Sequence, residues 1–311
     1  MISLGIDTSN YTTSIAFYDS ESQEIKQKKK LLPVRAGEKG LRQSDAVFHH
    51  TVQLPEITKE LFQNFSGHID SVGVSVSPRR IEGSYMPCFL AGKGFAESYT
   101  SIQNVPLYSF SHQEGHIVAA LYSANCLTLL EHPFLAFHLS GGTTEALYVT
   151  PSEQHILSAE LVLQSLDLKA GQLIDRVGVM LGLSFPCGPA LEELSKNATK
   201  SYKIHATMKD GNCCLSGIEN QCQKLKAEGE SSANIAKFCM DNIIEAVNQM
   251  ILSLHEKYGS LPIVFSGGVS GNQQMQSHFL KKYKDVYFAE PVFSSDNAAG
   301  IAILTAMMQE R

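Results

Sequence analysis

Two apolar segments of this chain end in the same tripeptide, Ser-Gly-Gly. The first reads FLAFHLSGGTTEALYV over residues 134–149, and the second reads PIVFSGGVSGN over residues 262–272. Glycine lets the backbone adopt positive φ and approach a ligand closely, and successive N–H groups in such turns form a concave site for an anion. We therefore interpret both segments as strands that end in candidate phosphate turns. An ordinary strand–turn junction is the alternative for either one alone.

The order of strands and helices around these turns occurs twice. In the first half, hydrophobic periodicity predicts strands at 2–7, 12–19, 24–32, 68–76 and 105–110, and helices at 45–64, 89–102 and 111–124. In the second half it predicts strands at 134–140, 145–151, 155–165, 262–268 and 285–291, and helices at 171–181, 189–196, 233–258, 272–283 and 296–308. The repetition predicts two similar α/β lobes. We place the N-terminal lobe at residues 1–111 with about 294–311, and the C-terminal lobe at 112–293.

Composition restricts the class of protein. With 43% hydrophobic and 18% charged residues the chain is globular, and no apolar run approaches the length of roughly 20 residues that a membrane helix needs. The N-terminus lacks the basic region and cleavage site of a signal peptide. Seven cysteines without a C-x-x-C pair indicate a reduced, cytoplasmic protein. A net charge of −6 argues against a strongly basic nucleic-acid binder, and we interpret the basic run Lys26–Lys30 as a solvated strand or loop.

A histidine pair is the main candidate for metal binding. His112 and His116 are four residues apart, which places both imidazoles on one helix face, and neutral imidazole binds Zn, Fe or Ni. Gln113 stands where the H-E-x-x-H motif of zinc proteases has its glutamate, so peptidase chemistry is disfavoured. Asp296 is a candidate third ligand, and its alternative role is to cap the last helix.

Two further aspartates have open roles at this stage. Asp7 ends the first strand and could bind phosphate or a metal-linked water, or could stabilise the turn at residues 8–11. Asp175 lies in a predicted helix, and its alternative role is a surface salt bridge with Arg176 or Lys169.

Seven motifs, spread from residue 4 to residue 302, resemble those of the TsaD (Gcp) family of tRNA threonylcarbamoyladenosine synthases. They are LGIDTS, SHQEGHIVAA, LSGGTTEALYV, GQLIDRVGVMLGLSFPCGPALEELS, LSGIEN, FSGGVSGN and SDNAAGIA. The resemblance implies an α/β, actin-like (ASKHA) fold of two lobes with a nucleotide and metal cleft between them. It also implies an acyltransferase that moves a threonylcarbamoyl group from its AMP anhydride to N6 of the tRNA adenosine beside the anticodon.

The same resemblance implies roles for individual residues. One divalent ion, Fe or Zn, would be bound by His112, His116 and Asp296. The adenine nucleotide, as threonylcarbamoyl-AMP, would be bound by Ser140, Gly141, Gly142, Asp175, Gly188, Glu192, Gly267, Gly268 and Asn272. The partners it implies are tRNA and proteins similar to TsaB and TsaE, with no membrane.

The chain departs from the family pattern around the first turn. The family reads GIETSCDET where this chain reads GIDTSNYTTS, so Asp7 replaces a glutamate, and Tyr11 and Thr12 replace acids. A phenol with a pKa of about 10 does not act as a base near pH 7. Further departures are Thr143 for a histidine, Arg79 and Arg80 in a Pro-Gly loop, and Glu219 for a lysine.

These departures leave two interpretations open. In one, the chain is an active transferase in which Asp7 and Tyr11 form the catalytic turn. In the other, it is a divergent paralogue that binds metal and adenine nucleotide but carbamoylates another acceptor or acts as a non-catalytic subunit.

Overall fold

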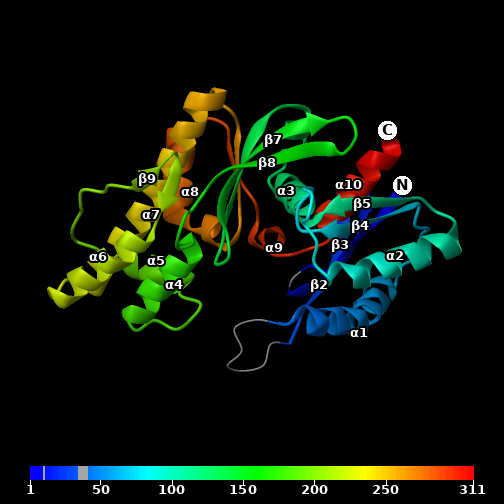
Figure 1. The fold of residues 1–311 in the computed structure, drawn as a ribbon, viewed down its shortest axis with the longest axis horizontal. Helices are drawn as coiled ribbons and strands as arrows, with labels where there is room; N and C mark the ends of the chain where they lie inside the picture. Colours follow the sequence, from blue (N-terminus) through cyan, green and yellow to red (C-terminus); the bar gives the residue numbers. More distant parts are fainter. Residues whose placement is uncertain (10, 34–40) are drawn as a thin grey trace. The chain divides into compact units, whose positions relative to one another are not determined.

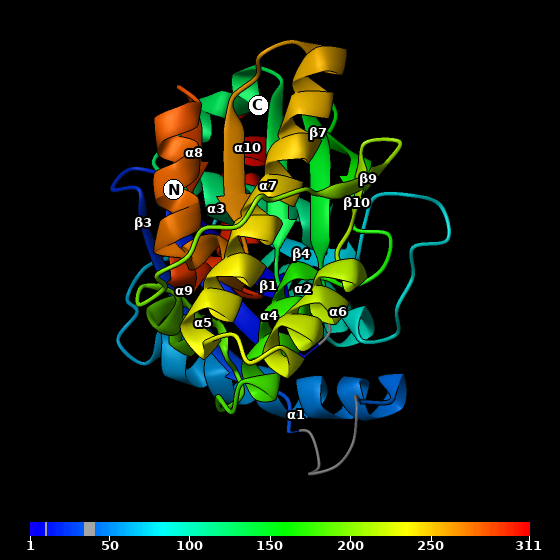
Figure 2. The same cartoon turned by 90° about the vertical axis from the view of Figure 1, so that its left-hand side faces the viewer.

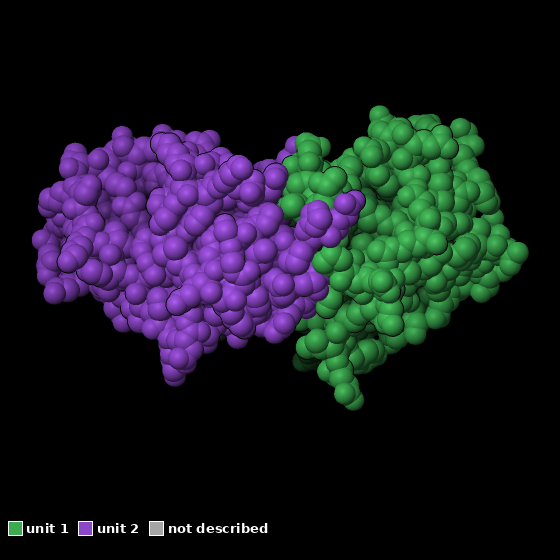
Figure 3. All heavy atoms as spheres, turned by 90° about the horizontal axis from the view of Figure 1, so that it is seen from above, with its two compact units in different colours: residues 1–130, 151–158, 292–311 green, residues 131–150, 159–291 purple. Residues whose placement is uncertain are grey.

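The computed structural model describes residues 1–9, 11–33 and 41–311. Asn10, within the turn predicted at 8–11, lies outside the described residues. The chain divides into two compact units: unit 1 comprises residues 1–130, 151–158 and 292–311, and unit 2 comprises residues 131–150 and 159–291 (Figure 3). Each unit contains its own five-stranded sheet.

The sheet of unit 1 has the strand order β3-β2-β1-β4-β5. Figure 1 labels β2, β3, β4 and β5 of this sheet. Its strands are β1 (Ile2–Asp7), β2 (Thr12–Asp19), β3 (Glu24–Leu31), β4 (Ser71–Ser77) and β5 (Leu107–Ser111). β1, β2 and β3 pair antiparallel, whereas β4 pairs parallel with β1 and with β5. The structure therefore confirms the strands predicted at 2–7 and 12–19 and the third strand after them.

Helices cover both faces of this sheet. They are α1 (Gln43–Phe62), α2 (Phe89–Gln103), α3 (His112–Ser123) and α10 (Ala299–Glu310). Leu54 and Ile57 of α1 pack with Ile15 and other apolar residues on one face. On the other face α10 lies directly against the strands, because a Cβ at Gly5 would be only 2.4 Å from the amide nitrogen of Ala302. Pro55 does not divide α1.

Helix α3 packs on α10 within unit 1. A Cβ added at Gly300 would lie 1.9 Å from the carbonyl oxygen of Gly115, so two glycines permit this close approach. The lobe boundaries given by the sequence stay a prediction. They assign α3 to the C-terminal lobe, whereas it packs here with the N-terminal strands and the last helix.

The sheet of unit 2 has the order β12-β11-β6-β7-β8. Its strands are β6 (Phe134–Leu139), β7 (Thr144–Ser152), β8 (Ile156–Gln164), β11 (Ile263–Ser266) and β12 (Val286–Phe288). β6 pairs antiparallel with β7 and parallel with β11. The first Ser-Gly-Gly turn joins the antiparallel strands β6 and β7. A small second sheet is formed by β9 (Thr207–Lys209) and β10 (Asn212–Cys214).

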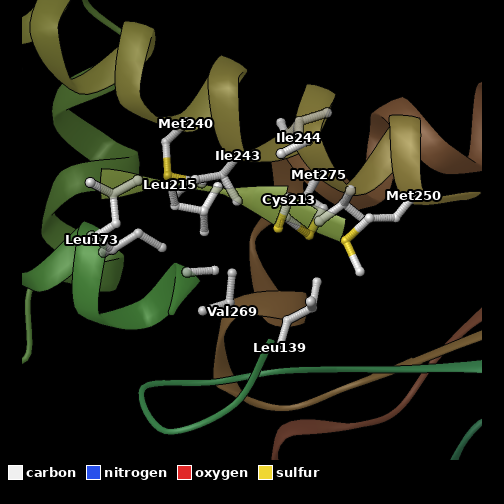
Figure 4. Close-up of a cluster of buried hydrophobic side chains, with 14 of the residues drawn as sticks. Leu139, Leu173, Cys213, Leu215, Met240, Ile243, Ile244, Met250, Val269 and Met275 are labelled. Carbon is white, nitrogen blue, oxygen red and sulfur yellow. The ribbon is translucent and has the colours of Figure 1, made fainter. Parts of the chain in front are cut away.

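The helices of unit 2 are α4 (Ala170–Met180), α5 (Gly188–Ser195), α6 (Ser216–Ala227), α7 (Ser232–Tyr258) and α8 (Gln273–Lys282). Figure 2 views this helical layer in front of the sheet. Its core joins Leu139 of β6 to apolar and sulfur-containing side chains (Figure 4), including Leu173, Cys213, Leu215, Met240, Ile243, Met250, Val269 and Met275. Among the described residues, no helix has the length and apolar character that crossing a membrane would require.

Candidate functional site

The first turn of α3 fixes where the histidine pair begins. Ser111 is the N-cap: its hydroxyl accepts a hydrogen bond from the Glu114 N–H, and the Glu114 carboxylate accepts one from the Ser111 N–H. This reciprocal capping box makes His112 the first helical residue. The ring centroids of His112 and His116 are 4.3 Å apart.

Asp296 completes a cluster of three possible metal ligands within unit 1. Its Oδ1 lies 3.2 Å from Nε2 of His116 and 3.6 Å from Nε2 of His112. The candidate ligand atoms all lie within 4.8 Å of one another, and the three residues are half-buried. Ligands of a tetrahedral ion with bonds of about 2.1 Å are about 3.4 Å apart. The donor set and its spacing therefore fit one divalent ion.

The capping role considered for Asp296 is wrong. The N-cap of α10 is Ala298 without a side-chain cap, and Asn297 Oδ1 accepts the hydrogen bond of the Ala299 N–H at 3.0 Å. Asn297 thus stabilises the start of the helix, and Asp296 faces the histidines instead. Thr12, at a position where the family pattern has an acid, donates its hydroxyl to Asp296 Oδ2 at 3.4 Å.

Asp7 lies behind His112 and is completely buried. Nδ1 of His112 donates to Asp7 Oδ2 at 2.8 Å, and the Ser9 hydroxyl donates to the same oxygen at 2.9 Å. The Ser75 hydroxyl donates to Oδ1. Metal-binding histidines commonly donate their second ring nitrogen to a carboxylate in this way, which fixes tautomer and ring orientation. With Nδ1 engaged, Nε2 of His112 is the nitrogen near Asp296.

The site concentrates opposite charges in a buried region. Burial alone lowers the pKa of His112, but the charges and hydrogen bonds of Asp7 and Asp296 outweigh it and raise that pKa to about 10. Burial raises the pKa of Asp296, yet its contacts with His112 and His116 hold it far below the usual range. The pKa of Asp7 is also lowered, because the charge of His112 and the hydrogen bonds exceed the effect of burial. Without a metal, these carboxylates thus retain a proton on His112.

A backbone hydrogen bond holds Tyr11 in position. Its carbonyl oxygen accepts a hydrogen bond from the Leu32 N–H at 2.8 Å, which ties the turn to the end of β3, and its side chain is half-buried.

The basic run is only partly a solvated strand. Lys28 and Lys30 reach Glu60 and Glu56 on α1. Lys29, whose side chain alternates to the other face of β3, donates to Val292 O at 3.0 Å and to Ser295 Oγ at 2.7 Å. Lys29 therefore anchors the segment that carries Asp296.

In unit 2 the first Ser-Gly-Gly turn is closed by its own serine. The Ser140 hydroxyl accepts hydrogen bonds from the N–H groups of Gly142 at 3.3 Å and Thr143 at 3.0 Å. Gly171, at the start of α4, lies so close that a Cβ there would be 2.6 Å from the nitrogen of Gly141. Gly141 and Gly142 are exposed. The Ser140 side-chain oxygen thus satisfies two backbone donors of the turn.

The second turn leads into α8. Gly267 has φ +90°, and a Cβ there would be 2.3 Å from the carbonyl oxygen of Leu139, so both conformation and space require glycine. Gly268 begins a short 3₁₀ turn, Gly268–Gly271. Asn272 then caps α8 by accepting from the Met275 N–H at 2.9 Å, and Glu192 Oε1 accepts from the Gln273 N–H at 2.8 Å.

The salt bridge considered for Asp175 is wrong. Its Oδ1 accepts the Cys187 N–H at 2.8 Å, immediately before Gly188 at the start of α5. Arg176 instead pairs with Glu219 at 3.1 Å, and Lys169 donates to the Ser165 carbonyl. The predicted nucleotide residues of unit 2 thus lie in the two turns, within α4 (Asp175), in α5 (Gly188 and Glu192) and at the N-cap of α8 (Asn272).

Sequence reasoning missed several of these polar contacts. Ser75 contacts Asp7 and Thr12 contacts Asp296, and both lie on strands where serine and threonine have no distinctive pattern. Arg80, noted only as a departure, forms an ion pair with the buried Glu114 of the capping box at 3.0 Å. His138 Nδ1 lies 3.1 Å from Ser266 Oγ, a contact that only the parallel register of β6 and β11 reveals.

Comparisons with known proteins agree on family and fold. The sequence profile of the family described as TsaD, tRNA N6-adenosine threonylcarbamoyltransferase, matches residues 28–303. A protein of that name from Sulfurihydrogenibium sp. (strain YO3AOP1) is 27% identical over 312 residues, which cover 97% of this chain and 89% of the relative.

Among solved structures, HypF in its phosphate- and nucleotide-bound form is 12% identical with a TM-score of 0.60, over 99% of this chain and 55% of that one. The chain therefore spans about half the length of HypF. Component A of (R)-2-hydroxyglutaryl-CoA dehydratase from Acidaminococcus fermentans is 14% identical with a TM-score of 0.55, over 100% of both chains. These likenesses show the fold alone, and it is the actin-like α/β fold that the motifs implied.

Proposed function

The chain belongs to the TsaD family of tRNA N6-adenosine threonylcarbamoyltransferases, which are acyltransferases, and from this premise we propose its reaction. It transfers a threonylcarbamoyl group from threonylcarbamoyl-AMP to N6 of the adenosine next to the anticodon in tRNA. The observation that carries the proposal is the cluster of His112, His116 and Asp296, with Asp7 fixing the orientation of His112.

His112, His116 and Asp296 hold one divalent ion, Fe or Zn, which the cluster fits in donor type and spacing. When bound, such an ion supplies a Lewis acid that polarises a carbonyl oxygen or anchors the anhydride. Asp7 acts as a positioning residue and not as a base toward substrate, because it is completely buried and already accepts from His112, Ser9 and Ser75. Tyr11 closes the turn beside it.

The turns of unit 2 bind the nucleotide. At the first turn, a phosphate oxygen takes the place of the Ser140 hydroxyl and accepts from the N–H groups of Gly142 and Thr143. Gly267 and Gly268 shape the second turn, while Glu192 and Asn272 fix the start of α8 beside it. Asp175 and Gly188 border the site at the start of α5.

The acceptor is a tRNA, and the reaction takes place in the cytoplasm. Partner proteins similar to TsaB and TsaE help the chain to bind the tRNA. A net charge of −6 supports a need for help, because phosphate backbones are bound chiefly by Lys and Arg.

A second candidate is a paralogue that binds metal and adenine nucleotide but carbamoylates another acceptor or serves as a non-catalytic subunit. The specific observation that favours it is the first turn, where Tyr11 and Thr12 stand in place of two acids.

The test is transfer of labelled threonylcarbamoyl from its adenylate to unmodified tRNA, by the protein alone and with family-type partners. We expect labelled tRNA from the wild type, and none from a variant that combines His112→Ala and His116→Ala. If nucleotide and metal bind but no tRNA is labelled under either condition, the second candidate is correct.

A further inference from the structure

We propose that His138 is the proton acceptor of the transfer step and acts through the hydroxyl of Ser266. This inference rests on the proposed function and assigns a catalytic group to it. His138 lies on β6 and Ser266 on β11, and the two residues are partners in the parallel register. Nδ1 of His138 and Oγ of Ser266 are 3.1 Å apart, which is the separation of a hydroxyl and the base that activates it.

The pair lies where its two strands reach the Ser-Gly-Gly turns. Ser266 is the last residue of β11 and directly precedes Gly267, while His138 is two residues before Ser140. In α/β sheets, ligands bind beyond the carboxyl ends of parallel strands. The pair therefore adjoins the two turns to which we assign the phosphate.

The pair is not part of the hydrophobic core of unit 2. Along β6, Phe137 and Leu139 belong to that core, so His138 between them points to the opposite face of the sheet. Ser266 follows Phe265, another core residue, and points to the same face as His138. His138 is half-buried, and Ser266 retains 9% exposure.

A carboxylate lies in the same row of the sheet. Glu145 on β7 stands directly opposite His138 in the antiparallel register. Opposed residues of such a pair have Cβ atoms about 4.5–5.5 Å apart. Glu145 is thus the residue of β7 that faces His138, and a negative charge on that neighbour favours the imidazolium that forms when His138 accepts a proton. Ser266, His138 and Glu145 thus present a hydroxyl, a base and an acid side by side.

The transfer step releases a proton, and the pair offers an acceptor for it. The N6 amine of adenosine attacks the carbonyl carbon, a new C–N bond forms, and the bond from that carbon to the bridging phosphate oxygen breaks, so AMP leaves with the electron pair. The carbon attacked is one oxygen atom away from the phosphorus, so a phosphate held at the turns brings it near the pair. The amine proton passes to Ser266 Oγ, whose own proton moves to Nδ1 of His138.

The decisive variants are His138→Asn and Ser266→Ala. Asparagine retains a group that hydrogen-bonds to Ser266 but does not accept a proton. We expect kcat to fall about 100-fold or more with His138→Asn, with the KM for threonylcarbamoyl-AMP unchanged and the acid limb of the pH–rate profile lost. We expect Ser266→Ala also to lower kcat and to leave the KM for threonylcarbamoyl-AMP unchanged. The matched control is His205→Asn, because His205 is an exposed histidine of unit 2 outside the strands and helices.

A second measurement separates catalysis from folding. With His138→Ala, added imidazole restores activity in proportion to its concentration, while AMP affinity stays at the wild-type value. An active wild type together with a His138→Asn variant of unchanged kcat and pH profile overturns this inference alone. So does a parallel loss of AMP binding without imidazole rescue, which indicates a structural role. A wild type that labels no acceptor overturns the proposed function as well.

Discussion

The candidate metal cluster of unit 1 and the paired turns of unit 2 are built from different parts of the chain. In unit 1, side chains from β1, from α3 and from the segment before α10 meet through hydrogen bonds between ionisable groups. In unit 2, the donors at the two turns and at the start of α8 are backbone N–H groups, and Ser140, Glu192 and Asn272 accept their hydrogen bonds. One site is defined by charge and the other by backbone shape.

This difference determines what each site requires of a ligand. Two carboxylates beside two imidazoles need a cation, and a proton on His112 supplies one when no metal is bound. At the turns of unit 2 the hydrogen-bond donors are backbone N–H groups, and Glu192 supplies the one carboxylate among their acceptors named above. Substitutions in unit 1 are therefore expected to act through metal affinity, and substitutions in unit 2 through the fold of the turns.

The largest effect is expected when the histidine pair is removed. A variant with His112→Ala and His116→Ala keeps one ligand of three, so it should lose its divalent ion completely on dialysis. Elemental analysis of the protein measures this. The control His205→Ala should keep the wild-type metal content, and an equal content in the double variant would show that the ion binds elsewhere.

In unit 2 the strongest effect is expected at Gly267. Alanine there combines an unfavourable positive φ with a Cβ 2.3 Å from the Leu139 carbonyl oxygen. We expect Gly267→Ala to reduce the free energy of unfolding by about 3 kcal/mol, as measured by urea denaturation. Gly268→Ala is the matched control, since a Cβ there meets nothing within 4 Å. Equal midpoints for the two variants would contradict the close packing of the turn.

Asp7 tests whether the carboxylate behind His112 matters for metal binding. Asp7→Asn removes the charge that fixes the ring, and we expect metal affinity to fall about 10–100-fold in a competition titration with a chelator. Asp19→Asn, at the other end of the β1–β2 pair, should leave it unchanged. If Asp7→Asn keeps the wild-type metal affinity, the hydrogen bond between Asp7 and His112 does not contribute to metal binding.

Stability of the metal-free protein should depend on pH through His112. Its pKa is raised by Asp7 and Asp296 from 6.5 to about 10, against the effect of burial. Because the folded protein holds the proton more tightly, this stabilisation is fully present below pH 6.5 and is lost as pH rises through 10. Thermal unfolding at pH 7 and pH 10 should show the loss, and a His112→Gln variant should show less of it. An identical decline in both proteins would assign the effect to other groups.

The smallest expected effect is a difference in metal affinity between substitutions at two neighbouring lysines of β3, Lys29 and Lys30. Lys29→Met removes the anchor of the segment before Asp296, and we expect metal affinity to fall about threefold, as exposed charged contacts contribute little. Lys30→Met breaks only the pair with Glu56 on α1 and should not alter metal affinity. The same titration compares them, and equal affinities would remove Lys29 from the site.

Much of the fold follows from local patterns. The strands at 2–7 and 12–19, the long helix at 233–258 and the turns after β6 and β11 were all predictable, because side-chain periodicity and glycine reflect local backbone conformation. Helix α6 was not, since only Ile218 and Cys222 of its twelve residues are buried and the apolar stripe is too weak to detect.

The sequence alone determined that His112 and His116 lie on one face of a helix, because residues four positions apart in a helix share a face. Only the tertiary structure decided that Asp296 joins them and does not cap α10, that Asp7 lies behind His112, and that Asp175 accepts from Cys187. The physical reason is separation along the chain: Asp7 and His112 are 105 residues apart, and His116 and Asp296 are 180 apart. Such partners meet only when sheets and helices pack, and no local pattern encodes that packing.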